Sequence, residues 1–285
     1  MKKQQLIVIG SGVVLFCLIY FFGTTTPPKQ ASAGKPSAGQ APAQPSSIDI
    51  KAVLAQAKQE LSPEQQAYIN KLEAGIVRGD LKEEQVKVYK NIAGFWKDSA
   101  HMLLPYAYYT ALASKLENSE KSLTFAAHYF LEGVRQQPEP ELKKWMALQA
   151  KELFEQALTI NPSNDSSKVG LGSCYLFGGI SEAPMQGIQM IREVAERDTS
   201  NMYAQFMLGL GGIQSGQFDK AIERLSKVVK KQPKNVEAII TLAEAYERTG
   251  DKTNAAKYYE ASKSFFKNDP AILKEIDQRI NDLKK

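Results

Sequence analysis

The sequence is poor in the side chains that most often form disulfides or bind metal ions. It has two cysteines and two histidines among 285 residues. Cys17 lies in an apolar run and Cys174 stands alone in the rest of the chain, so no disulfide framework is expected. Neither His101 nor His128 belongs to a metal-ligand spacing such as H-x-x-x-H. We therefore expect no metal site, and we expect Cys174 to be a small core residue.

The sequence also lacks a phosphate-binding loop and a strongly basic segment. "GLGGIQSG" at 209–216 has no following Lys-Ser/Thr pair and follows no predicted strand, so it is not a P-loop. Lysine and arginine number 36 against 31 acidic residues, but four of the basic residues and only one acid lie in the first 50 positions. The remainder is close to neutral, which argues against a nucleic-acid partner. No residue pattern predicts an enzyme or a cofactor.

The first long apolar run is "LIVIGSGVVLFCLIYFF" at 6–22, which carries no charge. Its length is at the short end of what a membrane-spanning helix needs. A cleaved signal peptide is disfavoured because the A-x-A sequence at 31–33 lies far beyond the run, and a lipoprotein is disfavoured because Cys17 lies inside it. The sequence therefore predicts an uncleaved transmembrane anchor.

The orientation of this anchor follows from two lysines near the N-terminus. Lys2 and Lys3 directly precede the apolar run, which favours a cytoplasmic N-terminus. Residues 23–47 hold five prolines and almost nothing to bury, so they predict a disordered tether. We expect a single-pass protein of a bacterial inner membrane with its folded part in the periplasm. A cytoplasmic placement of the folded part stays open as the alternative.

From residue 48 onward no segment shows strict alternation of apolar and polar residues, and apolar spacings of three and four predominate. One pattern recurs along this part: a bulky residue and a small one, an aromatic residue three positions later, and a glycine four further on. Its copies are Phe125-Ala126, Tyr129 and Gly133; Leu171-Gly172, Tyr175 and Gly179; Leu208-Gly209, Gly212 in the aromatic position and Gly216; and Leu242-Ala243, Tyr246 and Gly250. In the last two copies the interval from Leu208 to Leu242 equals the interval from Gly216 to Gly250.

This pattern and this interval resemble the tetratricopeptide repeat (TPR), a helix-turn-helix unit of about 34 residues. The resemblance covers 119–267 and implies an all-α solenoid in which each unit must stack on its neighbours. The first copy departs from the pattern by an insertion before Ala150. The predicted segments are a cytoplasmic N-terminus (1–5), a transmembrane anchor (6–22), a disordered Pro/Ala/Ser linker (23–47), an N-terminal helical segment with a degenerate repeat as an open alternative (48–118), four TPR-like repeats (119–164, 165–201, 202–235 and 236–267) and a C-terminal capping helix (268–285).

The resemblance also implies where a partner binds. In the family, positions 2, 5, 9, 12 and 13 of each first helix line the inner surface of the solenoid, and in the third repeat these positions are mostly apolar. Exposed apolar patches mark interaction sites, so we expect a groove for a protein or peptide segment. The alternative is that other parts of the chain already cover this surface. The candidate groove residues are Val169, Phe177, Tyr203, Phe206, Leu210, Ile213, Ile240 and Arg248.

Three functions are compatible with these observations. The favoured one is a membrane-anchored TPR scaffold that binds a protein or peptide in assembly or quality control of an envelope complex. The second is a structural tether that spaces envelope complexes without a binding groove. The third is an enzyme with a site in 48–117, where Trp96, Lys97, Asp98 and His101 lie close in sequence.

Overall fold

The computed structural model describes residues 48–76, 81–180 and 184–285, and the predicted anchor and linker lie outside these ranges. The described residues form α-helices and one 3-10 turn and contain no strand. They belong to a single compact unit, Pro45–Lys285. The all-α prediction is confirmed. In chain order the elements are α2 (Ile50–Gln59), α3 (Pro63–Glu73), α4 (Lys82–Asp98), α5 (Leu103–Glu117), α6 (Glu120–Gln136), α7 (Pro140–Ile160), α8 (Asp165–Phe177), α9 (Pro184–Arg197), α10 (Met202–Gln214), α11 (Phe218–Lys231), α12 (Val236–Arg248), α13 (Lys252–Ser262), η1 (Lys263–Phe265) and α14 (Pro270–Leu283).

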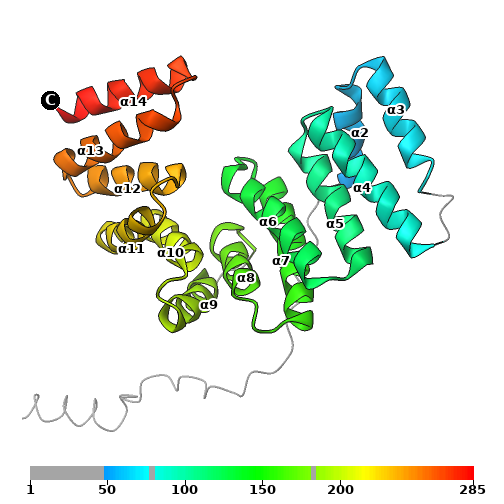
Figure 1. The fold of residues 1–285 in the computed structure, drawn as a ribbon, viewed down its shortest axis with the longest axis horizontal. Coiled ribbons are helices and arrows are strands. Elements are labelled where there is room, and N and C mark those ends of the chain that lie inside the picture. The colour runs from blue at the N-terminus through cyan, green and yellow to red at the C-terminus, as the bar shows by residue number, and fades with distance from the viewer. Residues whose placement is uncertain (1–47, 77–80, 181–183) are drawn as a thin grey trace, which may run out of the picture. The chain divides into compact units, whose positions relative to one another are not determined.

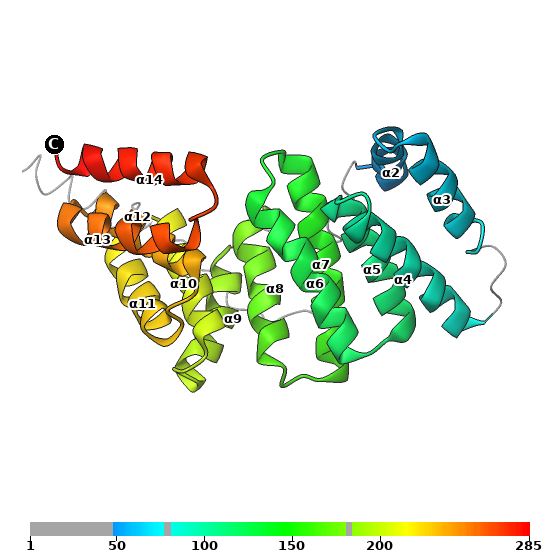
Figure 2. The ribbon, with the colours of Figure 1, turned by 45° about the horizontal axis from the view of Figure 1, so that its top comes forward.

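Consecutive helices pack as pairs, and each pair packs on the next (Figure 1). The pairs are α4 with α5, α6 with α7, α8 with α9, α10 with α11, and α12 with α13. Figure 2 shows α14 lying along α13 at the C-terminal end. Ile276 and Ile280 of α14 are buried in one cluster with Tyr259 of α13, so α14 covers the apolar face of the last pair.

Short polar residues begin the first helix of three successive pairs. Asn164, Asn201 and Asn235 are the N-caps of α8, α10 and α12, and each side chain accepts a hydrogen bond from a backbone N–H three residues later. Such caps satisfy donors that have no partner inside the helix. At the other ends, Gly216 and Gly250 adopt positive φ angles of 70° and 81° in the turns to the second helices. Only glycine adopts this backbone conformation without strain.

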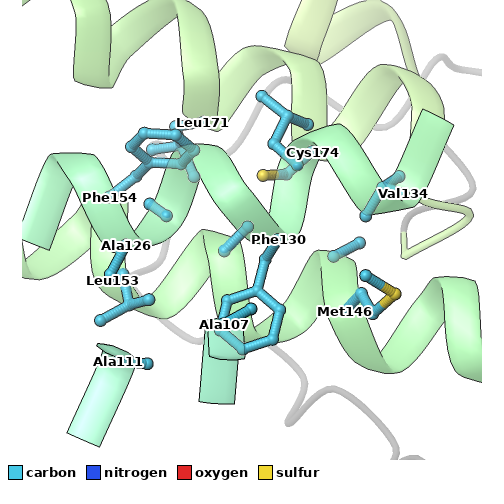
Figure 3. Packing of buried hydrophobic residues seen from close by; sticks show 14 of the residues in the cluster. Ala107, Ala111, Ala126, Phe130, Val134, Met146, Leu153, Phe154, Leu171 and Cys174 are labelled. Carbon is cyan, nitrogen blue, oxygen red and sulfur yellow. The ribbon is translucent and has the colours of Figure 1, made fainter. Parts of the chain in front are cut away.

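The first repeat is built differently from the others. Its pattern glycine, Gly133, lies inside α6, which continues to Gln136. The 21-residue helix α7 takes up the inserted residues. Buried side chains of α5, α6, α7 and α8 form the largest cluster in the described part of the chain, with Phe130, Phe154 and Cys174 among them (Figure 3). This cluster joins the first and second repeats.

In the segment before the repeats, the described residues form the helices α2 to α5. Trp96 of α4, which is fully buried, packs in one cluster with Leu54 of α2, Ile69 of α3 and Tyr106 of α5. Ser62 and Gln65 form a reciprocal capping box at the start of α3, with Pro63 in the first turn. Within the described ranges, no helix combines the length and the hydropathy that crossing a bilayer requires.

Candidate functional site

Two of the candidate groove residues lie in the core rather than on a surface. Val169 of α8 is 0% exposed and Phe206 of α10 is 6% exposed. Both belong to a cluster that includes Ala238 and Leu242 of α12. The prediction that Val169 and Phe206 face a partner is therefore wrong for this structure, because side chains of neighbouring repeats already contact them.

The first helices of several repeats also contact one another directly. The ring of Tyr203 on α10 lies 5.4 Å from the ring of His128 on α6, in an edge-on arrangement. Arg135 of α6 forms an ion pair with Glu237 of α12, which is 102 positions further along the chain. It also pairs with Glu132 of its own helix at 2.6 Å. The first helices of repeats one, three and four thus meet, and the surface between them is occupied by the chain itself.

The other candidate groove residues stay at the edge of the filled surface. The side chains of Leu210, Ile213 and Phe177 are half-buried and pack against the same cluster as Phe206. Ile240 is half-buried against the C-terminal cluster. Arg248 is exposed at the end of α12. Contact of these five residues with a partner stays a prediction.

A pocket that the sequence did not suggest lies between α4, α5 and α6. It has a volume of about 560 Å³. Phe125, which is 50% exposed, forms part of its wall. Gly94 leaves open space, because a Cβ atom added there would have no neighbour within 4 Å. The residues that line the pocket are Lys90, Ala93, Gly94, Lys97, Asp98, Tyr106, Thr110, Ala113, Ser114, Glu117, Ser119, Lys121, Ser122 and Phe125.

The polar groups of this α4–α6 pocket are only partly engaged with each other. Lys90 pairs with Glu117. The ammonium group of Lys97 lies 5.5 Å from the ring centre of Tyr106, a geometry in which the ring face attracts the cation. Desolvation, with a smaller contribution from Tyr129, raises the pKa of Tyr106 to about 12. The Tyr106 hydroxyl therefore stays protonated at neutral pH. The pocket combines apolar walls with three lysines and the acidic residues Asp98 and Glu117.

The structure separates the residues of the enzyme hypothesis. Trp96 is fully buried in the N-terminal core, while Lys97 and Asp98 line the α4–α6 pocket. His101 is exposed in the turn after α4, at a positive φ of 54°, and does not line the pocket. In the described part of the chain, no group of three His, Cys, Asp or Glu side chains is arranged to hold a metal ion. The four residues therefore do not line one common site, although Lys97 and Asp98 both line the α4–α6 pocket.

Neither Cys174 nor the "GLGGIQSG" segment is placed as a reactive or phosphate-binding site would require. Cys174 is fully buried in the same cluster as Phe130 and Phe154, and desolvation raises the pKa of its thiol. A buried, protonated thiol is a poor nucleophile. Residues 209–214 belong to α10, so the first part of the glycine-rich segment is helix and not a phosphate loop.

His128 of α6 is a half-buried histidine that contacts residues of α7, α8 and α10. Its Nε2 atom lies 2.9 Å from Ser166 Oγ, and its ring contacts the rings of Phe154 and Tyr203 edge-on. Burial lowers the pKa of His128, and the charge of Glu132 opposes this effect. The imidazole is therefore favoured in its neutral form where α6 meets α8 and α10.

This lowered pKa makes the stability of the protein depend on pH. The pKa of an unfolded histidine is about 6.5, so below that pH the unfolded chain binds more protons and the free energy of unfolding falls. Between pH 7.5 and pH 5.5 we expect His128 to account for a loss of up to about 1.4 kcal/mol. His128→Gln should remove this part of the pH dependence in urea unfolding, and the exposed-site variant His101→Gln should retain it. An unchanged pH dependence in His128→Gln would contradict the assignment.

Comparison with known proteins supports the repeat fold. A family model described as tetratricopeptide repeat matches residues 213–274, from the end of α10 to the start of α14. A tetratricopeptide repeat protein from Parabacteroides merdae has 15% sequence identity and a TM-score of 0.50, over 79% of this chain and 86% of that chain.

Two further structures resemble the chain more loosely. YrrB, described as a TPR protein with an unusual peptide-binding site, has 17% identity and a TM-score of 0.40, over 73% of this chain and 97% of that chain. MamA from Desulfovibrio magneticus RS-1 has 18% identity and a TM-score of 0.43, over 68% of this chain and 99% of that chain. No curated protein is significantly similar in sequence. The helix pairs and the likeness to the Parabacteroides structure show an all-α fold of stacked helix pairs, and within it residues 213–274 match the tetratricopeptide repeat.

Proposed function

We propose that this scaffold binds a segment of another protein, and that the α4–α6 pocket is its principal contact. The observation that supports this site is a pocket of about 560 Å³ beside the half-exposed ring of Phe125. An exposed aromatic residue next to apolar walls and cations is typical of an interaction surface. The surface around Phe206, by contrast, is filled by the chain's own side chains.

The proposal includes the membrane tether predicted from the sequence. The uncharged run at 6–22 and the proline-rich segment at 23–47 support a single-pass anchor in a bacterial inner membrane with the repeats in the periplasm. A binding domain held in this way would serve assembly or quality control of an envelope complex. Binding next to a membrane benefits from the high local concentration that a tether provides.

Photo-crosslinking in cells tests both parts of this proposal. A benzophenone amino acid in place of Phe125 should give a discrete product with another protein, recovered from the membrane fraction. Gly94→Leu should abolish that product, because its Cβ atom meets nothing within 4 Å and the larger side chain would occupy space in the pocket that Gly94 lines. The same probe at Phe265, an exposed aromatic position on η1 that does not line the pocket, is the matched control.

The same cell fractions also test whether residues 6–22 anchor the protein in the membrane. The full chain should sediment with membranes, and a chain without residues 6–22 should not. Products that form only within the chain, or equally from positions 125 and 265, would refute the binding site. A soluble full chain would refute the anchor.

The structure gives specific support to the second function, a tether that spaces envelope complexes. The expected groove is filled by the chain's own contacts, including the ion pair between Arg135 and Glu237. A spacing role requires a stable repeat domain and an anchor but no open groove. Shortening residues 24–46 should then impair function more than Gly94→Leu does, and the opposite order would favour the binding scaffold.

A further inference from the structure

The third repeat lacks an aromatic side chain that the other repeats have. Gly212 occupies the position held by Tyr129, Tyr175 and Tyr246 in the other copies. In the fourth repeat, the ring of Tyr246 stacks on the ring of Tyr258 of α13, with their centres 5.7 Å apart and their planes 3° apart. This pair of half-buried rings joins the two helices of its repeat.

The partner position differs as well. Tyr258 follows Arg224 by the same interval that separates Tyr246 from Gly212, so the stacked tyrosines of the fourth repeat correspond to Gly212 and Arg224 in the third. Arg224 Nη1 donates a hydrogen bond to the buried Gln205 Oε1 at 2.8 Å, which fixes the guanidinium group at the edge of the vacated space. The third repeat therefore has Arg224 where the fourth repeat has the ring of Tyr258. Where the fourth repeat has the ring of Tyr246, the third has only Gly212.

A cavity of about 250 Å³ is present at this place. For comparison, a dry cavity of about 150 Å³ is large enough to bind benzene. Leu176, Ile188 and Leu208 give it apolar walls, and Met185 at its edge is exposed. The residues that line the cavity are Leu176, Met185, Ile188, Arg192, Leu208, Gly211, Gly212, Ser215, Gln217, Lys220 and Arg224.

The charged residues of the described chain that line the cavity have one sign. Arg192 of α9 and Lys220 and Arg224 of α11 line it, and none of the described lining residues is acidic. Arg192 is exposed, and Lys220 Nζ donates to the uncharged side chain of Gln217, at 2.8 Å. The acids Glu193 and Glu196 line an adjoining depression on α9, which shares Met185, Ile188 and Arg192 with the cavity. The cavity thus favours a ligand that is both apolar and negatively charged.

We propose that this Gly212 cavity binds an aromatic side chain from an acidic segment of a partner protein. The ring takes the space that the repeat's own tyrosine fills elsewhere, beside the guanidinium group of Arg224. Carboxylates on either side of the ring pair with Arg192 and Lys220. This inference rests on the proposed role in protein binding, but it concerns a site on α8 to α11 that shares no residue with the α4–α6 pocket.

The test uses the purified full chain and fluorescence anisotropy of labelled synthetic peptides. The probe peptide has one phenylalanine flanked on each side by three Asp or Glu residues. We expect saturable binding that weakens at least tenfold when the phenylalanine is changed to alanine, and at least tenfold when the acidic residues are changed to lysine. The proposal would be overturned if the probe peptide does not bind, or if one of the two sequence changes leaves its affinity unaltered.

The decisive variant is Gly212→Tyr, which restores the aromatic residue of the repeat and should weaken the probe peptide at least tenfold. A Cβ atom at 212 would lie 3.1 Å from Ala221 Cβ and 3.3 Å from the Gln217 carbonyl oxygen, so α10 and α11 must shift by a few tenths of an ångström. Tyr246 has the equivalent small neighbour one repeat later, Ala255, which shows that such a pair of helices accommodates the ring. Far-UV circular dichroism and the urea midpoint confirm that the variant is folded.

Charge reversal gives a second variant that leaves the core unchanged. Lys220→Glu should weaken the probe peptide, whereas Lys230→Glu, on the same helix but outside the cavity, should weaken it by less than a factor of two. Equal effects of the two lysine variants would show that binding depends only on the overall charge of the protein, and would overturn the proposal that the peptide binds in this cavity. Gly94→Leu must leave peptide binding unchanged, so failure of the α4–α6 proposal and failure of this one are distinguishable.

Discussion

Phe154→Ala should lower the free energy of unfolding of the first repeats by about 3 to 5 kcal/mol, the usual range for removing a buried aromatic ring. Phe154 is 0% exposed. Its ring lies directly against the backbone of α8, since a Cβ atom added to Gly170 would be only 2.2 Å from Phe154 Cζ. It also supports the ring of His128 at 5.1 Å. No side chain at Gly170 is present to fill the cavity, so relaxation after the substitution should be small.

Urea unfolding followed by circular dichroism measures this loss. Because the stability of a repeat protein is a sum of local and neighbour terms, the variant should also separate the unfolding of the first two repeats from that of the C-terminal repeats. Phe265→Ala is the control, since Phe265 is 40% exposed and should change stability by less than about 1 kcal/mol. A loss below about 1 kcal/mol for Phe154→Ala would show that the ring does not join the first two repeats.

Gly187→Val should destabilise the second repeat by about 2 to 3 kcal/mol or more, through overpacking instead of a cavity. Here the backbones of two helices touch. A Cβ atom at Gly187 of α9 would lie 2.3 Å from the carbonyl oxygen of Gly172 on α8, and a Cβ atom at Gly172 would lie 2.7 Å from the carbonyl oxygen of Gly187. Because neither neighbour is the flexible end of a side chain, the two helices must move apart.

The matched control for this variant is a glycine in a helix with free space. Gly94→Ala adds a Cβ atom that meets nothing within 4 Å. Its gain in helix propensity should stabilise the chain by about 0.5 to 1 kcal/mol. Thermal and urea unfolding of the two variants should therefore shift in opposite directions. Shifts of equal sign and size would show that the contact between Gly172 and Gly187 does not limit the packing of α8 on α9.

The repeats were predictable because their signals are local. The regular spacing of Gly216 and Gly250 depends only on the turn that each repeat must make. The burial of Phe206 was not predictable in the same way. It depends on how far successive repeats rotate, which brings α6 close to α10 and α12, and no spacing in the sequence reports that rotation.

The α4–α6 pocket could not be predicted from the sequence, whereas the Gly212 cavity has a partial signal in it. The α4–α6 pocket arises where the first repeat meets helices that carry no repeat pattern, so Phe125 reads as an ordinary bulky repeat residue. The Gly212 cavity did have a signal, because a glycine replaces an aromatic residue in an otherwise regular repeat. Only the structure shows that Arg192, Lys220 and Arg224 surround the vacancy, because they come from two different helices.

The ion pair between Arg135 and Glu237 also has a consequence for synthesis of the chain. The two residues are 102 positions apart, and ribosomes add about 5 to 20 residues per second. For about 5 to 20 seconds after Arg135 is made, its partner on α12 therefore does not exist. During this interval Phe206 emerges before Ala238 and Leu242, the α12 residues of its cluster. The newly made chain thus presents to its surroundings, for seconds, an apolar surface that the finished protein covers.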